Sequence, residues 1–305
     1  MFINFLKKKS AQGYNLIQNF TFTIVKNIKN LEELVPQVRR DILRMVHGVN
    51  SGHPGGSLGC AEFFVVLFFH VMDSKNQFSM DGEHEDLFFL SNGHISPVYY
   101  SVLARKGFFE ISELSTFRKI NSRLQGHPTT HEGLPGVRIS SGSLGQGLSV
   151  AIGACLSKKL NGDKSIVYSL HGDGELQEGQ NWEAIMYAGS KKVDNLISTI
   201  DYNKQQIDGS TEDVLSLGNL KKKLESFNWI VFEVANGNNI SNIIEVMNFA
   251  KKETKKQKPI AILLHTVMGN GVDFMMHTHA WHGKAPNDEE LKKALLQNKE
   301  THGDY

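Results

Sequence analysis

The chain has 305 residues, and its 33 lysines and arginines almost balance its 32 aspartates and glutamates, which leaves a formal net charge of +1. A charge so close to zero argues against a general electrostatic attraction to nucleic acid or to an anionic membrane. The length, with 40% hydrophobic residues, suits one large α/β domain with a sizeable core.

The cysteine content and the apolar pattern bear on the cellular compartment and on whether the chain spans a membrane. Cys60 and Cys155 are the only cysteines, so the sequence predicts no disulfide framework and indicates a reducing, cytoplasmic environment. The longest apolar run, residues 58–72, is interrupted by Glu62 and is more typical of a buried helix than of a membrane span. The lysines at positions 7–9 are not followed by a clean apolar segment, so we expect no signal peptide.

The predicted helices and strands alternate along most of the chain. Residues 1–30 show no clear periodicity and are interpreted as an N-terminal extension or a peripheral helix. Between residues 31 and 48 apolar side chains recur at helical spacing, and the glycine-rich loop 51–56 that follows must turn tightly. The further helices are expected at 58–72, 96–106, 145–160, 179–191, 219–227 and 241–254. The strands are expected at 86–90, 165–170, 196–201, 229–234 and 259–266.

This alternation of strands and helices predicts the fold class. It is typical of an α/β protein with a mainly parallel sheet that is flanked by helices on both faces. Ligands of such sheets bind in the loops at the carboxyl ends of the strands. We expect the main domain to cover residues 31–290 and residues 291–305 to form a C-terminal tail.

The most informative motif is Gly-Asp-Gly at positions 172–174, directly after a predicted strand. Asn203 stands thirty positions after Asp173, at the end of the next strand. A carboxylate, an amide oxygen and a backbone carbonyl, which we assign to Gln205, form a set that binds Mg²⁺ when diphosphate oxygens complete the octahedron. Ca²⁺ or Mn²⁺ could replace it. Gly-Asp-Gly alone is common in turns, but the strand context and the spacing to Asn203 are similar to the thiamine diphosphate fingerprint.

Seven segments, in order along residues 31–290, extend this similarity. They are 51–55 (SGHPG), 91–94 (SNGH), 126–128 (GHP), 141–147 (SGSLGQG), 172–179 (GDGELQEG), 201–204 (DYNK) and 281–284 (WHGK). The set resembles the transketolase and deoxyxylulose-phosphate synthase group, and the segments around His127, Leu144 and Trp281 favour transketolase. The resemblance implies the thiamine diphosphate-binding fold.

The resemblance also implies roles for individual residues. Mg²⁺ is expected at Asp173, Asn203 and the Gln205 carbonyl. The residues expected to contact the cofactor are His53, His94, Gly142, Leu144, Gly174, Glu178, Asn203 and His282. Among these, Glu178 is expected in a carboxylate network that links two active sites across a dimer.

Four histidines are expected to be catalytic, namely His53, His94, His127 and His282. The implied reaction moves a two-carbon ketol unit from a ketose phosphate to an aldose phosphate. It requires protons to move on and off sugar hydroxyls, and imidazoles can donate or accept them near neutral pH.

The chain stops soon after the first domain of a transketolase. Full-length members continue with a second domain, which carries the activating glutamate and the aminopyrimidine pocket, and with a third. The resemblance therefore implies the N-terminal subunit of a split enzyme, which is active only with a second, C-terminal subunit. The expected assembly is α2β2. Sugar phosphates are the expected substrates, with no nucleic acid or membrane partner.

Other interpretations stay open at this point. A related split enzyme could condense a keto acid with an aldehyde, or a specialised transketolase could act on unusual sugars. A binding module that kept the fold without activity is a third possibility, although intact Asp173 and Asn203 argue against it. The spacing of His277, His279 and His282 also occurs in zinc sites, but the resemblance assigns His282 another role.

Two features depart from the family pattern. His171 takes a position that is usually apolar, so its environment is expected to differ. The segment between His127 and Gly142 is slightly longer than in yeast- and animal-type enzymes, which affects the expected sugar specificity. Within it, His131 is interpreted as structural.

Overall fold

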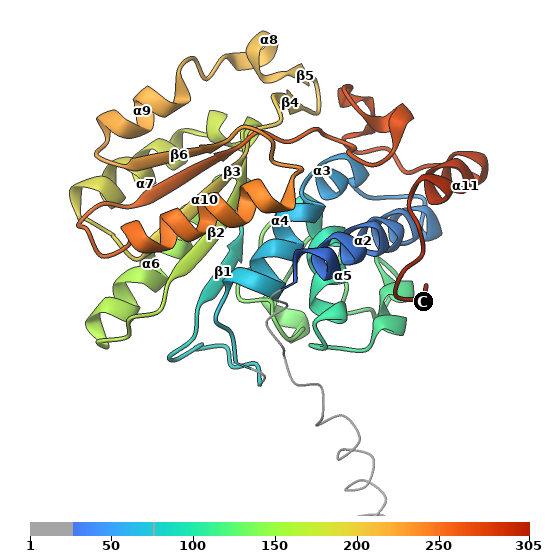
Figure 1. Ribbon diagram of the computed structural model, residues 1–305, viewed down its shortest axis with the longest axis horizontal. Coiled ribbons are helices and arrows are strands. Elements are labelled where there is room, and N and C mark those ends of the chain that lie inside the picture. Colours follow the sequence, from blue (N-terminus) through green and yellow to red (C-terminus); the bar gives the residue numbers. More distant parts are fainter. Residues whose placement is uncertain (1–26, 76) are drawn as a thin grey trace, which may run out of the picture.

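The computed structural model describes residues 27–75 and 77–305 (Figure 1). Most of the predicted extension, residues 1–26, lies outside the described residues. Helix α2 begins at Ile28, slightly before its expected start. In the described part of the chain, no helix is long and apolar enough to cross a membrane.

A parallel five-stranded sheet forms the centre of the described structure, in the order β1-β2-β3-β7-β6. Its strands are β1 (Leu87–Leu90), β2 (Val167–Gly172), β3 (Leu196–Asp201), β6 (Ile230–Val234) and β7 (Ile260–Leu264). Each lies where the sequence predicted a strand, which confirms the predicted fold class. A short antiparallel hairpin, β4 (Gln205–Gln206) with β5 (Gly209–Ser210), follows β3 and was not predicted.

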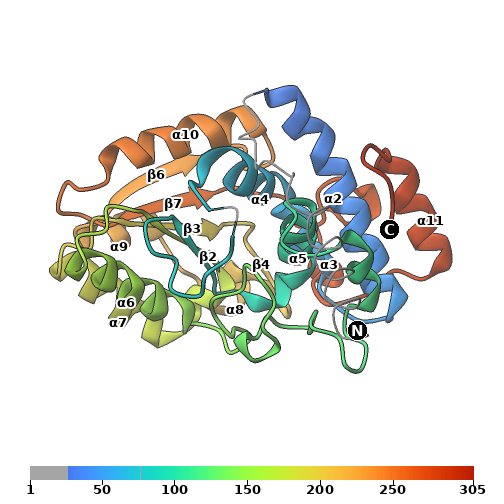
Figure 2. The same ribbon diagram turned by 90° about the horizontal axis from the view of Figure 1, so that it is seen from below.

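Helices cover both faces of this sheet (Figure 2). On one side lie α2 (Ile28–Gly48), α3 (Pro54–Gly59), α4 (Ala61–Val66), α5 (Ser96–Arg105) and α10 (Ile240–Glu253). On the other side lie α6 (Gly147–Leu160), α7 (Gly179–Ser190) and α9 (Leu220–Ser226). The short helix α8 (Thr211–Leu215) follows the hairpin, and α11 (Asp288–Gln297) lies near the C-terminus.

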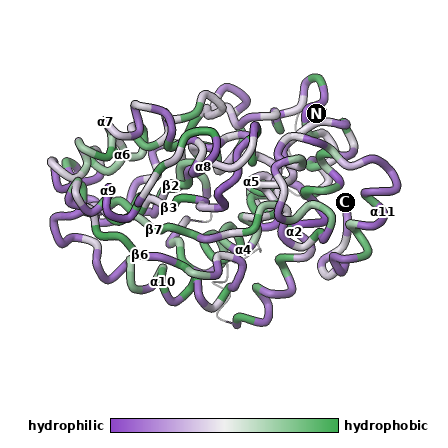
Figure 3. The backbone as a smooth tube through the Cα atoms, turned by 90° about the horizontal axis from the view of Figure 1, so that it is seen from above, coloured by the Kyte–Doolittle hydropathy of each residue, from purple (hydrophilic) through white to green (hydrophobic). Residues whose placement is uncertain are grey.

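Strand β7 shows how one sequence supplies two cores. Ile260, Ile262 and Leu264 pack into the cluster under α2, α4 and α10, whereas Ala261 and Leu263 pack into the cluster under α6 and α7. Successive side chains of a strand point to opposite faces, so a continuous apolar run fits a strand that is buried on both sides. Figure 3 shows the same distribution, with hydrophobic residues along the strands and hydrophilic ones in the outer loops.

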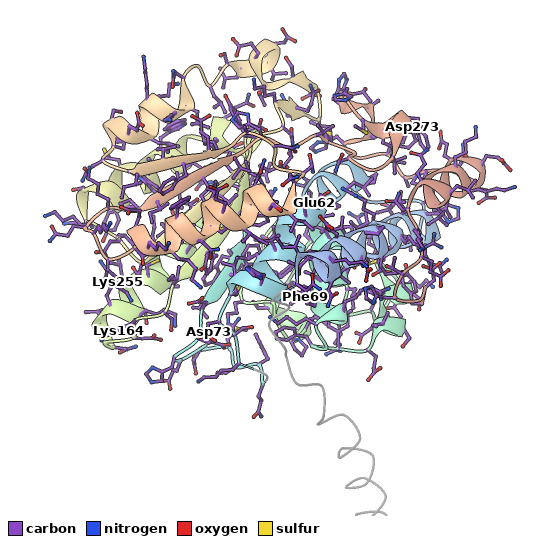
Figure 4. All side chains as sticks on the ribbon, viewed as in Figure 1. Glu62, Phe69, Asp73, Lys164, Lys255 and Asp273 are labelled. Atoms are coloured by element: carbon purple, nitrogen blue, oxygen red, sulfur yellow. The ribbon has the colours of Figure 1, made fainter. Side chains whose placement is uncertain are left out.

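The apolar run 58–72, expected as one helix, is buried but divided. It forms the end of α3, then α4, then a π-helical turn at Leu67–Val71. The break falls at Cys60, which stands between the two helices with φ −97° and ψ 5°. At the preceding Gly59, an added Cβ would lie 3.0 Å from the carbonyl oxygen of Val267, so the backbones of these two segments lie close together. Glu62, labelled on α4 in Figure 4, is buried against Arg39 of α2, whose Nη2 donates to Glu62 Oε1 at 2.5 Å.

The C-terminal residues are part of the packed structure. The expected boundary at residue 290 falls inside α11, whose first turn is closed by a capping box between Asn287 and Glu290. Asp273, labelled beside α11 in Figure 4, is tied to it, since its N–H donates to Gln297 Oε1 at 2.8 Å. Asp304 accepts hydrogen bonds from the Arg40 guanidinium of α2 at 2.8 and 2.5 Å. Residues 291–305 thus pack on α2 instead of forming a separate tail.

Candidate active site

Loops at the carboxyl ends of neighbouring strands meet at one edge of the sheet. Just after β1, the Ser91 N–H donates to the Leu170 carbonyl at 2.9 Å. Just after β2, the Asp173 N–H donates to the Asp201 carbonyl at 3.2 Å. The predicted polar residues are therefore brought together where parallel sheets bind their ligands.

Asp173 is the centre of the oxygen-rich part of this edge. Its Oδ1 accepts from the Gly174 N–H at 2.8 Å, and its Oδ2 accepts from the Lys204 N–H at 2.6 Å. The residue is 1% exposed, and burial together with nearby Asp201 raises the pKa of the Asp173 carboxyl to about 8. A cation bound beside this carboxylate would offset the cost of burying its charge.

Asn203 stands beside Asp173 on the next loop. Its Nδ2 donates to Asp201 Oδ2 at 2.9 Å, and its Oδ1 accepts from the Gln205 N–H at 2.8 Å. The side-chain oxygens of Asp173 and Asn203 and the Gln205 carbonyl are ligand types that Mg²⁺ accepts.

The structure does not support a zinc site at the three histidines whose spacing suggested one. Across residues 27–75 and 77–305, no group of three His, Cys, Asp or Glu side chains could hold a metal ion. His277, His279 and His282 therefore do not converge as three ligands.

Gly174 and Gly142 allow the backbone to approach closely. A Cβ at Gly174 would lie 2.9 Å from Gln206 Cβ, so a side chain there would displace the hairpin. Gly142 has a φ of +141°, and a Cβ there would lie 2.9 Å from His127 Cγ. Both glycines are half-buried, and the absence of a side chain lets His127 and Gln206 pack close to the backbone beside the site. The Leu144 carbonyl, two positions after Gly142, accepts from Gln180 Nε2 at 3.1 Å.

The four predicted histidines form one cluster. The ring of His53 lies 5.1 Å from that of His94, 6.2 Å from His127 and 5.6 Å from His282, measured between centroids. His94 and His282 are 5.1 Å apart. His53, His94 and His282 are half-buried, whereas His127 is exposed at the rim. These residues come from loops that lie far apart in the sequence.

The surroundings of the cluster keep its imidazoles neutral. Burial, with the nearby His282 and Arg118, lowers the pKa of His53 to about 4. Burial likewise lowers the pKa of His94, His127 and His282, and for His127 the charge of Arg118 adds to the effect. A neutral imidazole carries one donor and one acceptor nitrogen, so the cluster can exchange protons with hydroxyl groups near neutral pH.

Several buried polar atoms here have no hydrogen-bond partner among the described residues. They are His53 Nδ1, His282 Nδ1, Asn92 Oδ1 and Ser141 Oγ. Buried polar groups are almost always paired in folded proteins. Their grouping at one edge of the sheet indicates a place where a polar ligand binds.

Glu175 supports this edge and was not singled out from the sequence. It is buried and accepts from the Ser91 hydroxyl, from the Gly145 N–H at 2.8 Å and from the Gly172 N–H at 3.1 Å. One carboxylate thus joins the loops after β1 and β2 to the loop before α6. Its position inside the Gly-Asp-Gly-Glu motif was the available signal.

Glu178 and His171 differ in their surroundings. Glu178 is exposed at the start of α7 and makes no capping hydrogen bond there. His171 is buried, its Nε2 lies 2.9 Å from Ser169 Oγ, and burial lowers its pKa to about 3. The unusual histidine of β2 is therefore a neutral, hydrogen-bonded core residue beneath the site.

Residues 31–301 match the family model described as "Transketolase, thiamine diphosphate binding domain". The chain belongs to the transketolase family. The family and the fold predicted from the sequence are thereby confirmed. The match also runs past residue 290, in agreement with the packed C-terminal segment.

Named relatives fall into two groups by length. A subunit of the apulose-4-phosphate transketolase of Actinobacillus succinogenes is 36% identical, with 88% of this chain and 96% of the relative covered. The 6-deoxy-6-sulfo-D-fructose transketolase subunit of a Clostridium species is 35% identical, with the same coverage. Human transketolase is 33% identical, with 89% of this chain but 42% of the relative covered.

Solved structures give the same result. Transketolase from Campylobacter jejuni superposes with a TM-score of 0.81 at 33% identity, covering 89% of this chain and 43% of that one. Transketolase from Leishmania mexicana gives a TM-score of 0.82 at 28% identity, covering 90% and 42%. The chain therefore spans less than half the length of these transketolases.

Proposed function

We propose that this chain is the thiamine diphosphate-binding subunit of a split transketolase, which transfers a two-carbon ketol unit from a ketose phosphate to an aldose phosphate. The observation that carries the proposal is the pairing of two sites at one sheet edge. An oxygen set around Asp173 and Asn203 lies at the edge where four histidine rings cluster.

The site residues divide into three roles. Asp173, Asn203 and the Gln205 carbonyl would hold Mg²⁺, or Ca²⁺ or Mn²⁺ in its place. Gly174, His94 and His282 would contact the diphosphate, while Gly142 and Leu144 would approach the aminopyrimidine. Thiamine diphosphate, when bound, supplies the stabilisation of negative charge that two-carbon transfer requires.

The histidines would handle protons on the substrate. His53, with its unpartnered Nδ1, and His127 would face the sugar hydroxyls, and His282 would serve both cofactor and substrate. Because burial keeps these imidazoles neutral, each can accept a proton from a hydroxyl or donate one to a developing alkoxide. The half-buried position of His53 and His282 limits access of water to the reacting carbons.

A second chain would complete the site. Relatives of this length are named as subunits of their enzymes, which supports a partner chain, and the assembly we propose is α2β2. In that assembly the exposed Glu178 would join the carboxylate network between two active sites. The two free, buried cysteines suit the cytoplasm, where we place the enzyme.

Reconstitution tests the proposal. The chain is combined with the product of a neighbouring reading frame that encodes the missing domains, with Mg²⁺ and thiamine diphosphate. We expect ketol transfer from xylulose 5-phosphate or a related ketose, and its loss in Asp173→Ala but not in the control Asp81→Ala, whose carboxylate is exposed. No cofactor binding in this mixture would refute the proposal.

A specialised sugar substrate is the second candidate. The relatives matched over almost their full length are named for apulose 4-phosphate and for 6-deoxy-6-sulfo-D-fructose. A panel of ketose donors, with pyruvate as a keto acid control, separates a general transketolase, a specialised one and a keto acid condensing enzyme.

A further inference from the structure

Asp201, the last residue of β3, is a buried carboxylate directly beside the proposed metal ligands. The residue is 2% exposed. Its backbone carbonyl accepts from the Asp173 N–H at 3.2 Å, so it lies next to the loop that presents the proposed metal carboxylate. A buried carboxylate is stable only when its oxygens are paired. The partners of Asp201 therefore show which segments it holds together.

Three side chains donate to the Asp201 carboxylate, and each comes from a different segment. The Thr266 hydroxyl, just after β7, donates to Oδ1. The Cys60 thiol, between α3 and α4, also donates to the carboxylate. After β3, Asn203 Nδ2 donates to Oδ2 at 2.9 Å. Asp201 thus ties the loop that carries Asn203 to two segments that lie far from it in the sequence.

The contacts on both sides of Asn203 fix one orientation of its amide. Nδ2 donates to the Asp201 carboxylate, whose oxygens accept, while Oδ1 accepts from the Gln205 N–H at 2.8 Å. A flipped amide would set its oxygen against the carboxylate and its NH₂ group against the Gln205 N–H, so both hydrogen bonds would be lost. An amide oxygen has two lone pairs, so the observed orientation leaves one of them for a cation.

We propose that Asp201 is a positioning residue of the metal site and that it holds the Asn203 amide with its oxygen toward the cation. The inference rests on the proposed function, which assigns Mg²⁺ to this edge of the sheet. Residues that hydrogen-bond to metal ligands orient them, and their loss typically lowers metal affinity about 10- to 100-fold. Asp201 acts on the cation through Asn203, and its contacts to Cys60 and Thr266 hold its own carboxylate in place.

Metal affinity tests this role without the need for turnover. Mn²⁺ is titrated into the reconstituted complex with saturating thiamine diphosphate, and the free ion is measured by its electron paramagnetic resonance signal. In Asp201→Ala the Asn203 amide loses the contact that orients it, so we expect Mn²⁺ to bind about 10- to 100-fold more weakly. The matched control is Asp86→Ala. Asp86 is also buried but precedes β1 at the amino edge of the sheet, where it accepts from the Ile166 N–H at 2.8 Å. The control should lose stability and keep the wild-type affinity for Mn²⁺.

Two comparisons separate positioning from the mere loss of a negative charge. Asp201→Asn removes the charge but keeps an oxygen that can accept from Asn203 Nδ2, so Mn²⁺ affinity should stay within about threefold of wild type. In an Asn203→Ala background, Asp201→Ala should cause no further loss of affinity, because the amide that it orients is gone. If Asp201→Ala does not fold, Asp201→Ser carries the same comparisons, since its hydroxyl ends one atom short of the carboxylate oxygens.

The outcomes separate the two proposals. A wild-type complex that binds neither Mn²⁺ nor thiamine diphosphate contradicts the proposed function. If the wild-type complex binds both, an unchanged Mn²⁺ affinity in Asp201→Ala overturns the role of Asp201 alone. Equal losses in Asp201→Ala and Asp201→Asn, or a full further loss in the Asn203→Ala background, overturn it as well.

Discussion

Asp41 and Asp173 are both buried carboxylates, but only Asp41 has a cation beside it. Where α2 packs on α5, Asp41 accepts from Arg105 at 2.6 and 2.8 Å and from Ser101 at 2.7 Å. At the carboxyl edge of the sheet, Asp173 accepts from backbone N–H groups alone among the described residues. Side chains of this chain pair the Asp41 carboxylate fully. At the edge of the sheet, by contrast, the Asp173 carboxylate and the histidine nitrogens are left for ligands to pair with.

The largest expected effect is at the carboxyl edge of the sheet, where a substitution should reduce activity but not stability. In the reconstituted enzyme, His53→Ala should lower kcat by about 10²- to 10⁴-fold, the usual contribution of a positioned acid or base. Its free energy of unfolding should not fall, because the Nδ1 of His53 has no partner to lose. Steady-state kinetics and urea unfolding measure the two effects. A clear loss of stability with little loss of kcat would show that His53 is a structural residue and not a catalytic one.

Asp41→Ala should show the opposite behaviour. Removal of this carboxylate leaves Arg105 buried and unpaired, which should lower the free energy of unfolding by about 3–5 kcal/mol. The matched control is Glu113→Ala, which breaks the more exposed pair with Arg123 and should cost less than ~1 kcal/mol. Urea unfolding of wild type and the two variants measures these losses. Equal losses of unfolding free energy in both variants would contradict the comparison.

The pH dependence of stability sharpens the contrast. Since the folded-state pKa of His53 lies at about 4, below its ordinary value of 6.5, the folded state resists protonation. Below pH 6.5 the unfolded state takes up a proton at His53 that the folded state refuses, so the free energy of unfolding falls as the pH drops towards 4, by up to ~3 kcal/mol. Unfolding of wild type and His53→Gln across this range measures it. If the free energy of unfolding falls equally with pH in both proteins, His53 is not responsible for the pH dependence.

The smallest effect concerns the C-terminal segment. Asp304→Ala removes the acceptor of a half-buried pair with Arg40, so we expect a loss of about 1–2 kcal/mol. Thermal unfolding checks the stability, while activity of the folded enzyme should be unchanged because this pair lies on α2, away from the site. No change in stability would indicate that residues 291–305 contribute little to the packing of α2.

The features that the sequence predicted well depend on local pattern or on matched motifs. Continuous apolar runs predicted all five strands of the sheet, and the spacing of Asp173 and Asn203 predicted their meeting at its edge. The four histidines were predicted from motif order and do cluster.

The missed features depend on contacts between distant segments. The helix break at Cys60 lies beside Gly59, whose backbone packs closely against the distant Val267 carbonyl. The packing of residues 291–305 depends on Arg40 and Asp304, whose polar segment carries no strong apolar period.

Cofactor affinity is the property that depends most strongly on Asp173. Thiamine diphosphate with Mg²⁺ is titrated calorimetrically into complexes reconstituted with wild type, with Asp173→Asn and with the control Asp81→Asn. We expect wild type and Asp81→Asn to bind alike and Asp173→Asn to bind ~100-fold or more weakly, since outer-shell ligand changes alone cost about 10- to 100-fold. Equal affinity in all three complexes would contradict the claim that Asp173 organises the metal and diphosphate site.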